Sequence, residues 1–251
     1  MNEKVTGIVL KQTDYRDHAV LLSVLTKEYG KLSFVANGVR RLTSKNAGSI
    51  QPYTLAEIQF DYKEGKTMFR LQTVSVRQLY RHIHEDLTAS AAAGVLCETA
   101  DVLNPEMLDP DLGAFTFDLL EQALGLLNEG KRSDIVIAVF LARMLSETGM
   151  GPDVDSCVLC GSGLVQAISI REGGFLCPSC AEKTGEELRS AASLRQFRLL
   201  NKASFEHYDI LTASVDRCLE DCRILTGFLV RHAGLQMRSF TFYEELFALN
   251  G

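Results

Sequence analysis

The sequence predicts an α+β protein of several domains: a five-stranded β-barrel, then an α-helical domain that carries an inserted zinc-ribbon-like module. Three observations predict this fold class. Apolar residues alternate with a period of two up to residue 80, recur with a helical period of 3.6 from residue 81, and are interrupted there by two Cys-x2-Cys pairs. A chain of 251 residues with 46% hydrophobic residues can bury two or three small cores. The predicted domains are residues 1–80 and 81–251, with the metal module at 154–183.

The N-terminal part predicts five strands joined by polar turns. In the fourth strand, Ala56, Ile58 and Phe60 fall on one face, whereas Glu57 and Gln59 fall on the other. Five strands in 80 residues favour a closed barrel, because closure removes exposed strand edges. The pattern alone does not separate an OB-type from an SH3-like barrel. The predicted strands are 5–11, 19–26, 31–37, 53–62 and 67–79.

Beyond residue 81 the sequence predicts helices over 86–103, 112–128, 133–148 and 214–232. A capping box at Ser193 predicts one further short helix. Apolar runs are too short to span a bilayer, and the N-terminus lacks the pattern of an export signal. We therefore expect a cytoplasmic protein without a membrane partner.

Four of the seven cysteines form the strongest local motif. Cys157 and Cys160 make one Cys-x2-Cys pair, and Cys177 and Cys180 make another after sixteen intervening residues. This spacing is typical of a tetrahedral zinc site, whereas two unconnected thiol pairs or a redox motif are the alternatives. Four protein ligands leave no open position for water, so the pattern predicts one structural Zn²⁺ ion.

The net charge of −6 conceals an asymmetry between the two parts of the chain. Residues 1–80 carry 12 Lys and Arg against 7 Asp and Glu, a net charge of +5, whereas the remainder carries −11. A basic barrel with interleaved aromatic residues is typical of single-strand DNA binders, although similar barrels serve as protein adaptors. The candidate DNA-binding cations are Arg40, Arg41, Lys45, Lys11, Arg16, Lys31, Lys63, Lys66 and Arg70.

The chain lacks the sequence signatures of common catalytic sites. It has no phosphate-binding loop, no nucleophile elbow and no dinucleotide-binding glycine motif. We therefore expect no enzymatic activity, no catalytic residue and no small-molecule substrate.

Several stretches resemble one family over nearly the whole chain. They are 7–10, 25–32, 35–41 with Ser44, 51–53 and 149–161, and the order of barrel, helices, metal module and helices matches as well. The chain is similar to the RecO recombination mediators of bacterial DNA repair. One departure is Asn37, where the family commonly has a Lys.

The resemblance implies an OB-fold barrel, binding of single- and double-stranded DNA, and annealing of complementary strands. It also implies partnership with RecR and with the acidic, apolar-ended C-terminal tail of SSB, in loading RecA onto SSB-coated single strands. Candidate cations for that tail are Lys131, Arg132 and Arg143. The competing hypothesis is a zinc-containing adaptor whose barrel binds protein and not DNA.

Overall fold

The computed structural model describes residues 2–15, 19–37, 47–106, 110–234 and 236–249. The chain divides into two compact units, Met1–Lys131 and Arg132–Gly251. The first unit thus includes three helices beyond residue 80. Within the described ranges, no helix is both long and apolar enough to cross a membrane.

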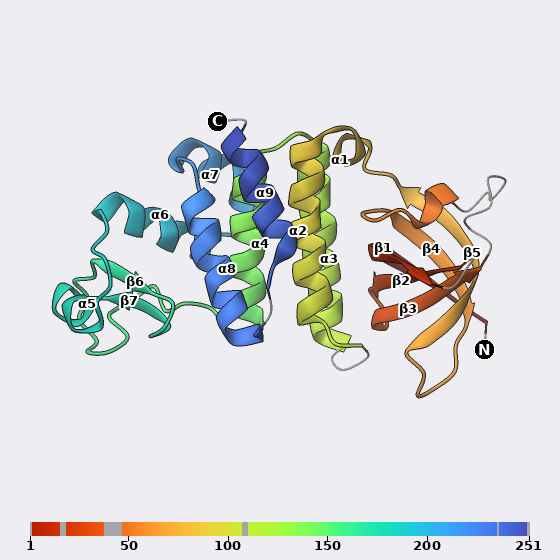
Figure 1. Ribbon diagram of the computed structural model, residues 1–251, viewed down its shortest axis with the longest axis horizontal. Helices are drawn as coiled ribbons and strands as arrows, with labels where there is room; N and C mark the ends of the chain where they lie inside the picture. The colour runs from red at the N-terminus through yellow and green to blue at the C-terminus, as the bar shows by residue number, and fades with distance from the viewer. Residues whose placement is uncertain (1, 16–18, 38–46, 107–109, 235, 250–251) are drawn as a thin grey trace. The chain divides into compact units, whose positions relative to one another are not determined.

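Five strands close a barrel in the first unit, as the sequence predicts (Figure 1). The strand order is β1-β2-β3-β5-β4, with β1 antiparallel to β4 and β3 parallel to β5. A five-stranded Greek-key barrel of this order is the OB arrangement, which settles the choice that the sequence pattern left open. The strands are β1 (Asn2–Tyr15), β2 (Ala19–Thr26), β3 (Gly30–Asn37), β4 (Leu55–Asp61) and β5 (Met68–Gln78).

Alternation along the strands fills the barrel with apolar side chains. Ala56, Ile58 and Phe60 of β4 are fully buried, as predicted. The Phe60 ring packs edge-on against Phe34 and Phe69, at centroid distances of 5.1 and 4.9 Å. The barrel interior is therefore a packed core without room for a ligand.

The helices of the first unit cover one outer face of the barrel. The backbone N–H of Ala89 donates to the Asp86 carboxylate, and this cap starts α2. Helix α3 approaches β3 so closely that a Cβ on Gly113 would lie 2.7 Å from the Gly30 Cα. The elements are η1 (Ala47–Ile50), α1 (Arg81–Glu85), α2 (Leu87–Leu103) and α3 (Pro110–Asn128). Because α2 and α3 contact β1, β2 and β3, this part of the barrel surface is occupied.

The second unit is built around α4, which is buried along nearly its whole length. A helix that is apolar on every side belongs inside a protein, and α4 packs against α6 and α8. The metal module follows it, with a short hairpin and one helix (Figure 1). The elements are α4 (Ser133–Glu147), β6 (Ala167–Ser169), β7 (Gly174–Leu176), α5 (Pro178–Thr184), α6 (Ala191–Lys202), η2 (Phe205–His207), α7 (Tyr208–Ser214), α8 (Leu219–Ala233) and α9 (Arg238–Leu249).

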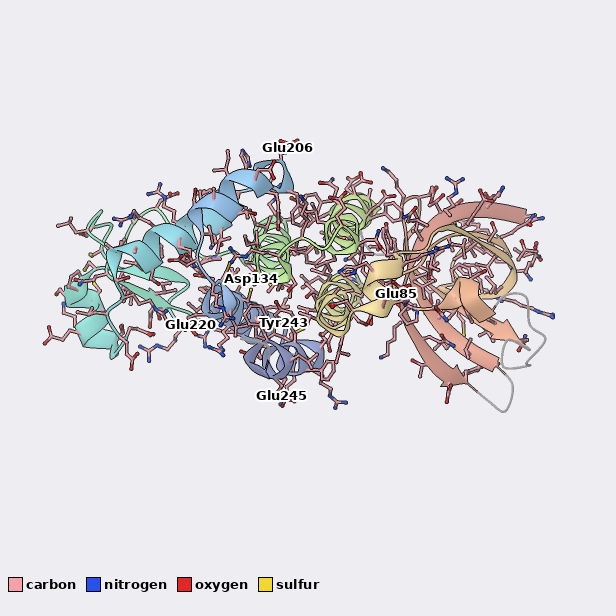
Figure 2. The ribbon with its side chains drawn as sticks, turned by 90° about the horizontal axis from the view of Figure 1, so that it is seen from above. Glu85, Asp134, Glu206, Glu220, Tyr243 and Glu245 are labelled. Carbon is pink, nitrogen blue, oxygen red and sulfur yellow. The ribbon has the colours of Figure 1, made fainter. Side chains whose placement is uncertain are left out.

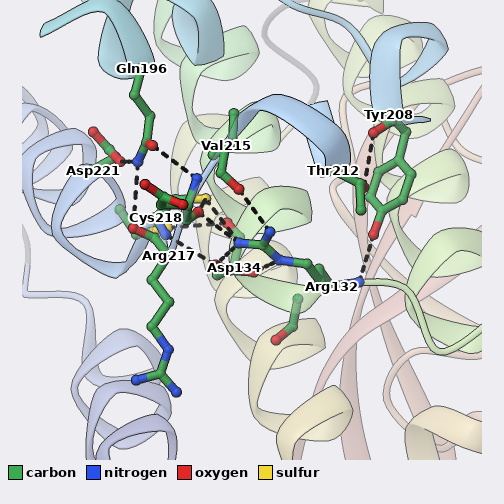
Figure 3. Close-up of polar contacts among 12 residues, drawn as sticks. Arg132, Asp134, Gln196, Tyr208, Thr212, Val215, Arg217, Cys218 and Asp221 are labelled. Atoms are coloured by element: carbon green, nitrogen blue, oxygen red, sulfur yellow. Dashed lines mark hydrogen bonds and ion pairs between the residues drawn. The ribbon is translucent and has the colours of Figure 1, made fainter. Parts of the chain in front are cut away.

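Two helices predicted in the second unit are present, but the positions predicted for their starts are wrong. Ser190, and not Ser193, is the N-cap of α6, and its hydroxyl accepts the N–H of Ser193. The predicted helix over 214–232 is broken at 215–218. The Arg132 guanidinium binds two carbonyl groups in that break, at Val215 (2.9 Å) and Asp216 (2.8 Å), so these groups need no helical partner (Figure 3).

Candidate metal centre and nucleic-acid interface

The four predicted cysteine ligands converge on one point. The sulfur atoms of Cys157, Cys160, Cys177 and Cys180 all lie within 4.8 Å of one another. A tetrahedral zinc ion with bonds of about 2.3 Å separates its sulfur ligands by about 3.8 Å. The Cys160 and Cys177 sulfurs are 3.7 Å apart, so the arrangement fits this geometry.

Local backbone structure positions the two pairs. Gly161 adopts a left-handed φ of 73°, which lets the chain turn after Cys160, and its N–H donates to the carbonyl of Cys157 at 2.8 Å. The second pair stands at the end of β7, where Pro178 opens α5 directly after Cys177. The hairpin β6–β7 thus sets the distance between the two pairs.

The electrostatics of the cluster favour a thiolate at Cys157. Burial opposes ionisation there, but backbone N–H groups directed at the sulfur outweigh it and lower the pKa of Cys157 to about 6. Cys97, Cys218 and Cys222 are also buried, and burial raises the pKa of each of these thiols above its ordinary value. The three stay neutral, as small buried core residues do.

Three of the predicted DNA-binding cations lie together at one end of the barrel. Lys63 and Lys66 belong to the loop between β4 and β5, and Arg70 lies on β5. They line a hollow of about 440 Å³ whose wall also holds Met68 and one acid, Asp61. Within the described chain, these three cations form no ion pair.

The Asp61 carboxylate accepts a hydrogen bond from Gln72 at 2.8 Å. In OB-folds this loop between the fourth and fifth strands is one of the elements that bind oligonucleotides.

Lys31 is held differently from these three cations. Its ammonium group lies 3.2 Å from the Asp101 carboxylate of α2, and only 14% of its side chain is exposed. Ser23 of β2 donates to the same carboxylate at 2.7 Å. Lys31 therefore ties the barrel to α2. Lys11 is exposed on β1, away from the hollow.

Three further barrel cations, which lie outside the predicted DNA-binding set, are paired with carboxylates. Lys4 and Arg77 both pair with Glu57, at 2.6 and 2.8 Å, and Lys27 pairs with Asp118 at 2.6 Å. The structure thus separates paired from unpaired cations, which composition could not do. Arg16, Arg40, Arg41 and Lys45 lie outside the described residues.

The structure also sorts the aromatic residues of the barrel. Phe34 is fully buried, whereas Tyr53 is half-buried, and the desolvation of its hydroxyl raises its pKa to about 12. Tyr29 and Tyr62 stack on each other at 5.1 Å and remain half-buried. Tyr62 directly precedes the two loop lysines, so this pair is the best placed of these aromatics to meet a base.

Of the three predicted tail-binding cations, Arg132 and Arg143 belong to the second unit, and these two do not form one patch. Arg132 and Arg143 stand about 16 Å apart along α4, at 1.5 Å per residue. Lys131 belongs to the first unit. Arg132 forms an ion pair with Asp134 at 2.8 Å, and its backbone N–H donates to the Tyr208 hydroxyl at 2.7 Å.

Figure 2 places Asp134 among the helices, whereas Glu206 and Glu245 point outward. Burial opposes ionisation of Asp134, but Arg132 and the Cys218 N–H outweigh it and hold its pKa below the ordinary value.

Sequence reasoning missed two residues beside Arg132. Arg217 stacks on the ring of Phe247 with its guanidinium carbon 5.3 Å from the centroid. Both residues line a hollow of about 580 Å³ together with Arg132. Arg217 sits in the break between α7 and α8, where a continuous helix was predicted, so no sequence signal indicated it.

An OB-type barrel with a basic loop, joined to helices and a four-cysteine module that can hold a metal, defines a class of multidomain OB-fold proteins. Two family models match the chain: "Recombination protein O N terminal" over residues 1–80 and "Recombination protein O C terminal" over residues 84–240. The chain therefore belongs to the RecO family, as its resemblance predicted, and has a role in DNA repair.

Curated relatives match nearly the full length. The chain is 31% identical over 245 residues to "DNA repair protein RecO" of Bacillus pumilus (strain SAFR-032), covering 97% of this chain and 94% of the relative. It is 31% identical over 247 residues to the protein of that name from Moorella thermoacetica, covering 96% and 90%. The corresponding protein of Anaeromyxobacter sp. (strain Fw109-5) is 30% identical over 257 residues, covering 99% and 98%.

Proposed function

We propose that this protein is a non-enzymatic recombination mediator that binds single- and double-stranded DNA and anneals complementary strands. The observation that supports this most directly is the hollow lined by Lys63, Lys66 and Arg70, three unpaired cations in the described part of the barrel. Phosphate binding needs cations that no carboxylate already neutralises, because the contact then releases the counterions condensed on the DNA. The β2–β3 face meets this need poorly, because α2 and α3 occupy it and Lys31 is paired there.

Annealing requires no covalent step. Cations at the end of the barrel reduce the repulsion between two phosphate backbones and hold both strands near each other, after which base pairing drives the reaction. The half-buried Tyr62, which precedes the basic loop, stacks on Tyr29 at 5.1 Å and on Phe69 at 5.8 Å, so a base would contact the exposed edge of this ring.

The decisive experiment compares two triple alanine variants with the same change in charge. One replaces the three unpaired cations Lys63, Lys66 and Arg70; the control replaces Lys4, Lys27 and Arg77, which are paired with carboxylates. Binding of a labelled single-stranded oligonucleotide is measured between 50 and 300 mM salt.

Each phosphate contact of a single strand contributes about 0.7 to the slope of log K against log salt. We therefore expect the first variant, which removes three cations, to reduce this slope by about 2, and the control to reduce it by less than 1. The annealing rate of complementary oligonucleotides should fall in parallel.

Equal losses in both variants would show that only net charge matters and would remove the hollow from the interface. Absence of salt-dependent oligonucleotide binding by the unchanged protein would favour the adaptor hypothesis.

We also propose that the four cysteines hold one structural Zn²⁺ ion. When bound, the ion would cross-link the hairpin and α5 of a module whose own core is small. Metal analysis should find one zinc per chain, which Cys157→Ser loses and Cys97→Ser retains. A metal-free protein after purification under reducing conditions would refute the zinc site.

The partners that we propose are RecR and the acidic, apolar-ended tail of SSB, acting in RecA loading in the bacterial cytoplasm. Of the three predicted cations, Arg132 alone lines the hollow that also holds Arg217 and Phe247, which offers both a charge and an apolar surface. A tail peptide should bind Arg217→Glu more weakly than the unchanged protein. Equal binding to both proteins would place the tail elsewhere.

A further inference from the structure

A second hollow in the second unit has a different character from the one at Arg217. It has a volume of about 420 Å³ and lies between the metal module and the first turns of α6. Its lining is mostly apolar, with one cation and no acidic residue: Gly163, Leu164, Val165, Gln166, Pro178, Ala191, Leu194 and Arg195. Leu164 is 81% exposed, more than any other large hydrophobic residue of the described chain.

The backbone around this hollow is fixed by hydrogen bonds. Gln166 donates its N–H to Leu176 of β7 and accepts the N–H of Arg189, both at 2.8 Å. The latter bond ties the segment that carries Leu188, which is 56% exposed, to the segment that carries Leu164. Exposed leucines on an ordered framework indicate a surface that another molecule covers.

The wall that the metal module contributes continues directly from the cysteine cluster. Leu164 follows Cys160 by four residues, and Pro178 stands between Cys177 and Cys180. A metal ion held by these cysteines would therefore fix Leu164 and Pro178 relative to each other on that side of the hollow.

We propose that this hollow is a metal-dependent docking site for a partner protein that presents an apolar side chain next to a carboxylate. The apolar side chain would contact Leu164 and Leu194, and the carboxylate would meet Arg195. Within the described chain, Arg195 has no ion pair, and no acid lines the hollow to compete for it.

The lining argues against two other occupants. Single-stranded nucleic acid binds through aromatic stacking, and no aromatic residue of the described ranges lines this hollow. A second copy related by a two-fold axis would bring the same surface, including Arg195, against itself without a neutralising acid.

The test is a selection from a random dodecapeptide phage library on zinc-loaded full-length protein, after depletion of the library on the Leu164→Asp variant. Because Leu164 is largely exposed, that variant should fold normally. We expect enriched peptides that pair an apolar residue with Asp or Glu. Individual peptides should bind Leu164→Asp and Arg195→Glu at least about tenfold more weakly, and should lose binding when the zinc is chelated.

Matched controls lie elsewhere in the same unit. Ile210→Asp changes an equally apolar side chain that is 59% exposed on α7, and Arg217→Glu changes the other hollow; neither should affect these peptides. Failure to enrich peptides, enrichment without an acidic residue, or binding that survives chelation would overturn the proposal. Sedimentation that shows a dimer lost in Leu164→Asp would instead assign the hollow to a second copy. DNA binding by the barrel should remain unchanged throughout.

Discussion

Replacing Arg132 by alanine tests whether this residue stabilises the fold or is only a surface cation. Its guanidinium pairs with Asp134 at 2.8 Å and binds the carbonyls of Val215 and Asp216 (Figure 3). The Asp134 side chain is 4% exposed and would keep the Cys218 N–H, at 3.0 Å, as a remaining partner. The substitution therefore leaves a buried carboxylate without its counter-charge.

The expected loss of unfolding free energy depends on how deeply this ion pair is buried. Removing one partner of a buried ion pair costs about 3–5 kcal/mol of unfolding free energy. The Arg132 side chain is 35% exposed, so solvent screens part of the interaction. We expect Arg132→Ala to cost about 2–3 kcal/mol at pH 7. A cation used only for peptide binding would cost about 0.5 kcal/mol or less.

The pH dependence gives a second signature. The pKa of Asp134 is lowered in the folded protein, so its ionised form contributes stability above the unfolded pKa of about 3.9. That contribution is lost as the pH falls through the folded pKa. The difference between Arg132→Ala and the unchanged protein should therefore be full at pH 7 and shrink below about pH 4.

The assay is urea unfolding followed by far-ultraviolet circular dichroism. Hydrogen exchange in α4 and α8 would assign the loss to the second unit. Arg231→Ala is the matched control, because Arg231 is exposed at the end of α8 and forms no ion pair in the described part of the chain. Equal costs for the two variants, or a cost for Arg132→Ala that does not change with pH, would refute this reasoning.

Three further substitutions test other parts of the structure. Burial raises the pKa of Asp221 to about 6, so the ionised carboxylate destabilises the folded protein above that pH. Asp221→Asn should therefore stabilise the fold by about 1–2 kcal/mol at pH 7.5 and have no effect near pH 4, as measured by urea midpoints. Gly113→Ala should lower the unfolding free energy by about 1–3 kcal/mol in thermal unfolding, because its Cβ would meet the Gly30 backbone. The control Gly125→Ala on the same helix meets nothing within 4 Å and should raise the unfolding free energy by up to about 1 kcal/mol. Lys31→Gln should lower stability yet leave the salt slope of oligonucleotide binding unchanged; a fall of about 0.7 in that slope would place DNA on the β2–β3 face.

Local patterns in the sequence determined much of the fold. Alternation at Ala56, Ile58 and Phe60 predicted β4 and its buried face, and the strand Ala19–Thr26 has the predicted bounds. The two Cys-x2-Cys pairs predicted the cluster in full, because each pair is a local turn and only one hairpin separates them. These predictions agree with the folded structure because each depends only on residues that are close to one another in the chain.

Helix boundaries in the second unit were less predictable. The run 214–232 has a helical period, but Arg132 binds the Val215 and Asp216 carbonyls from 83 and 84 residues away and stabilises a break. No pattern within the run itself records that contact.

The sequence by itself determined that a basic barrel precedes an acidic helical body with four converging cysteines, since composition and spacing are properties of the chain. Only the tertiary structure decided which cations are free. Lys31 and Lys63 are equivalent in the sequence, yet α2 brings Asp101 to the first, and the second lies at an unpaired basic hollow. Charge pairing depends on distances of a few ångströms between residues remote in sequence, so the fold, and not the composition, sets which cations the surface leaves unpaired.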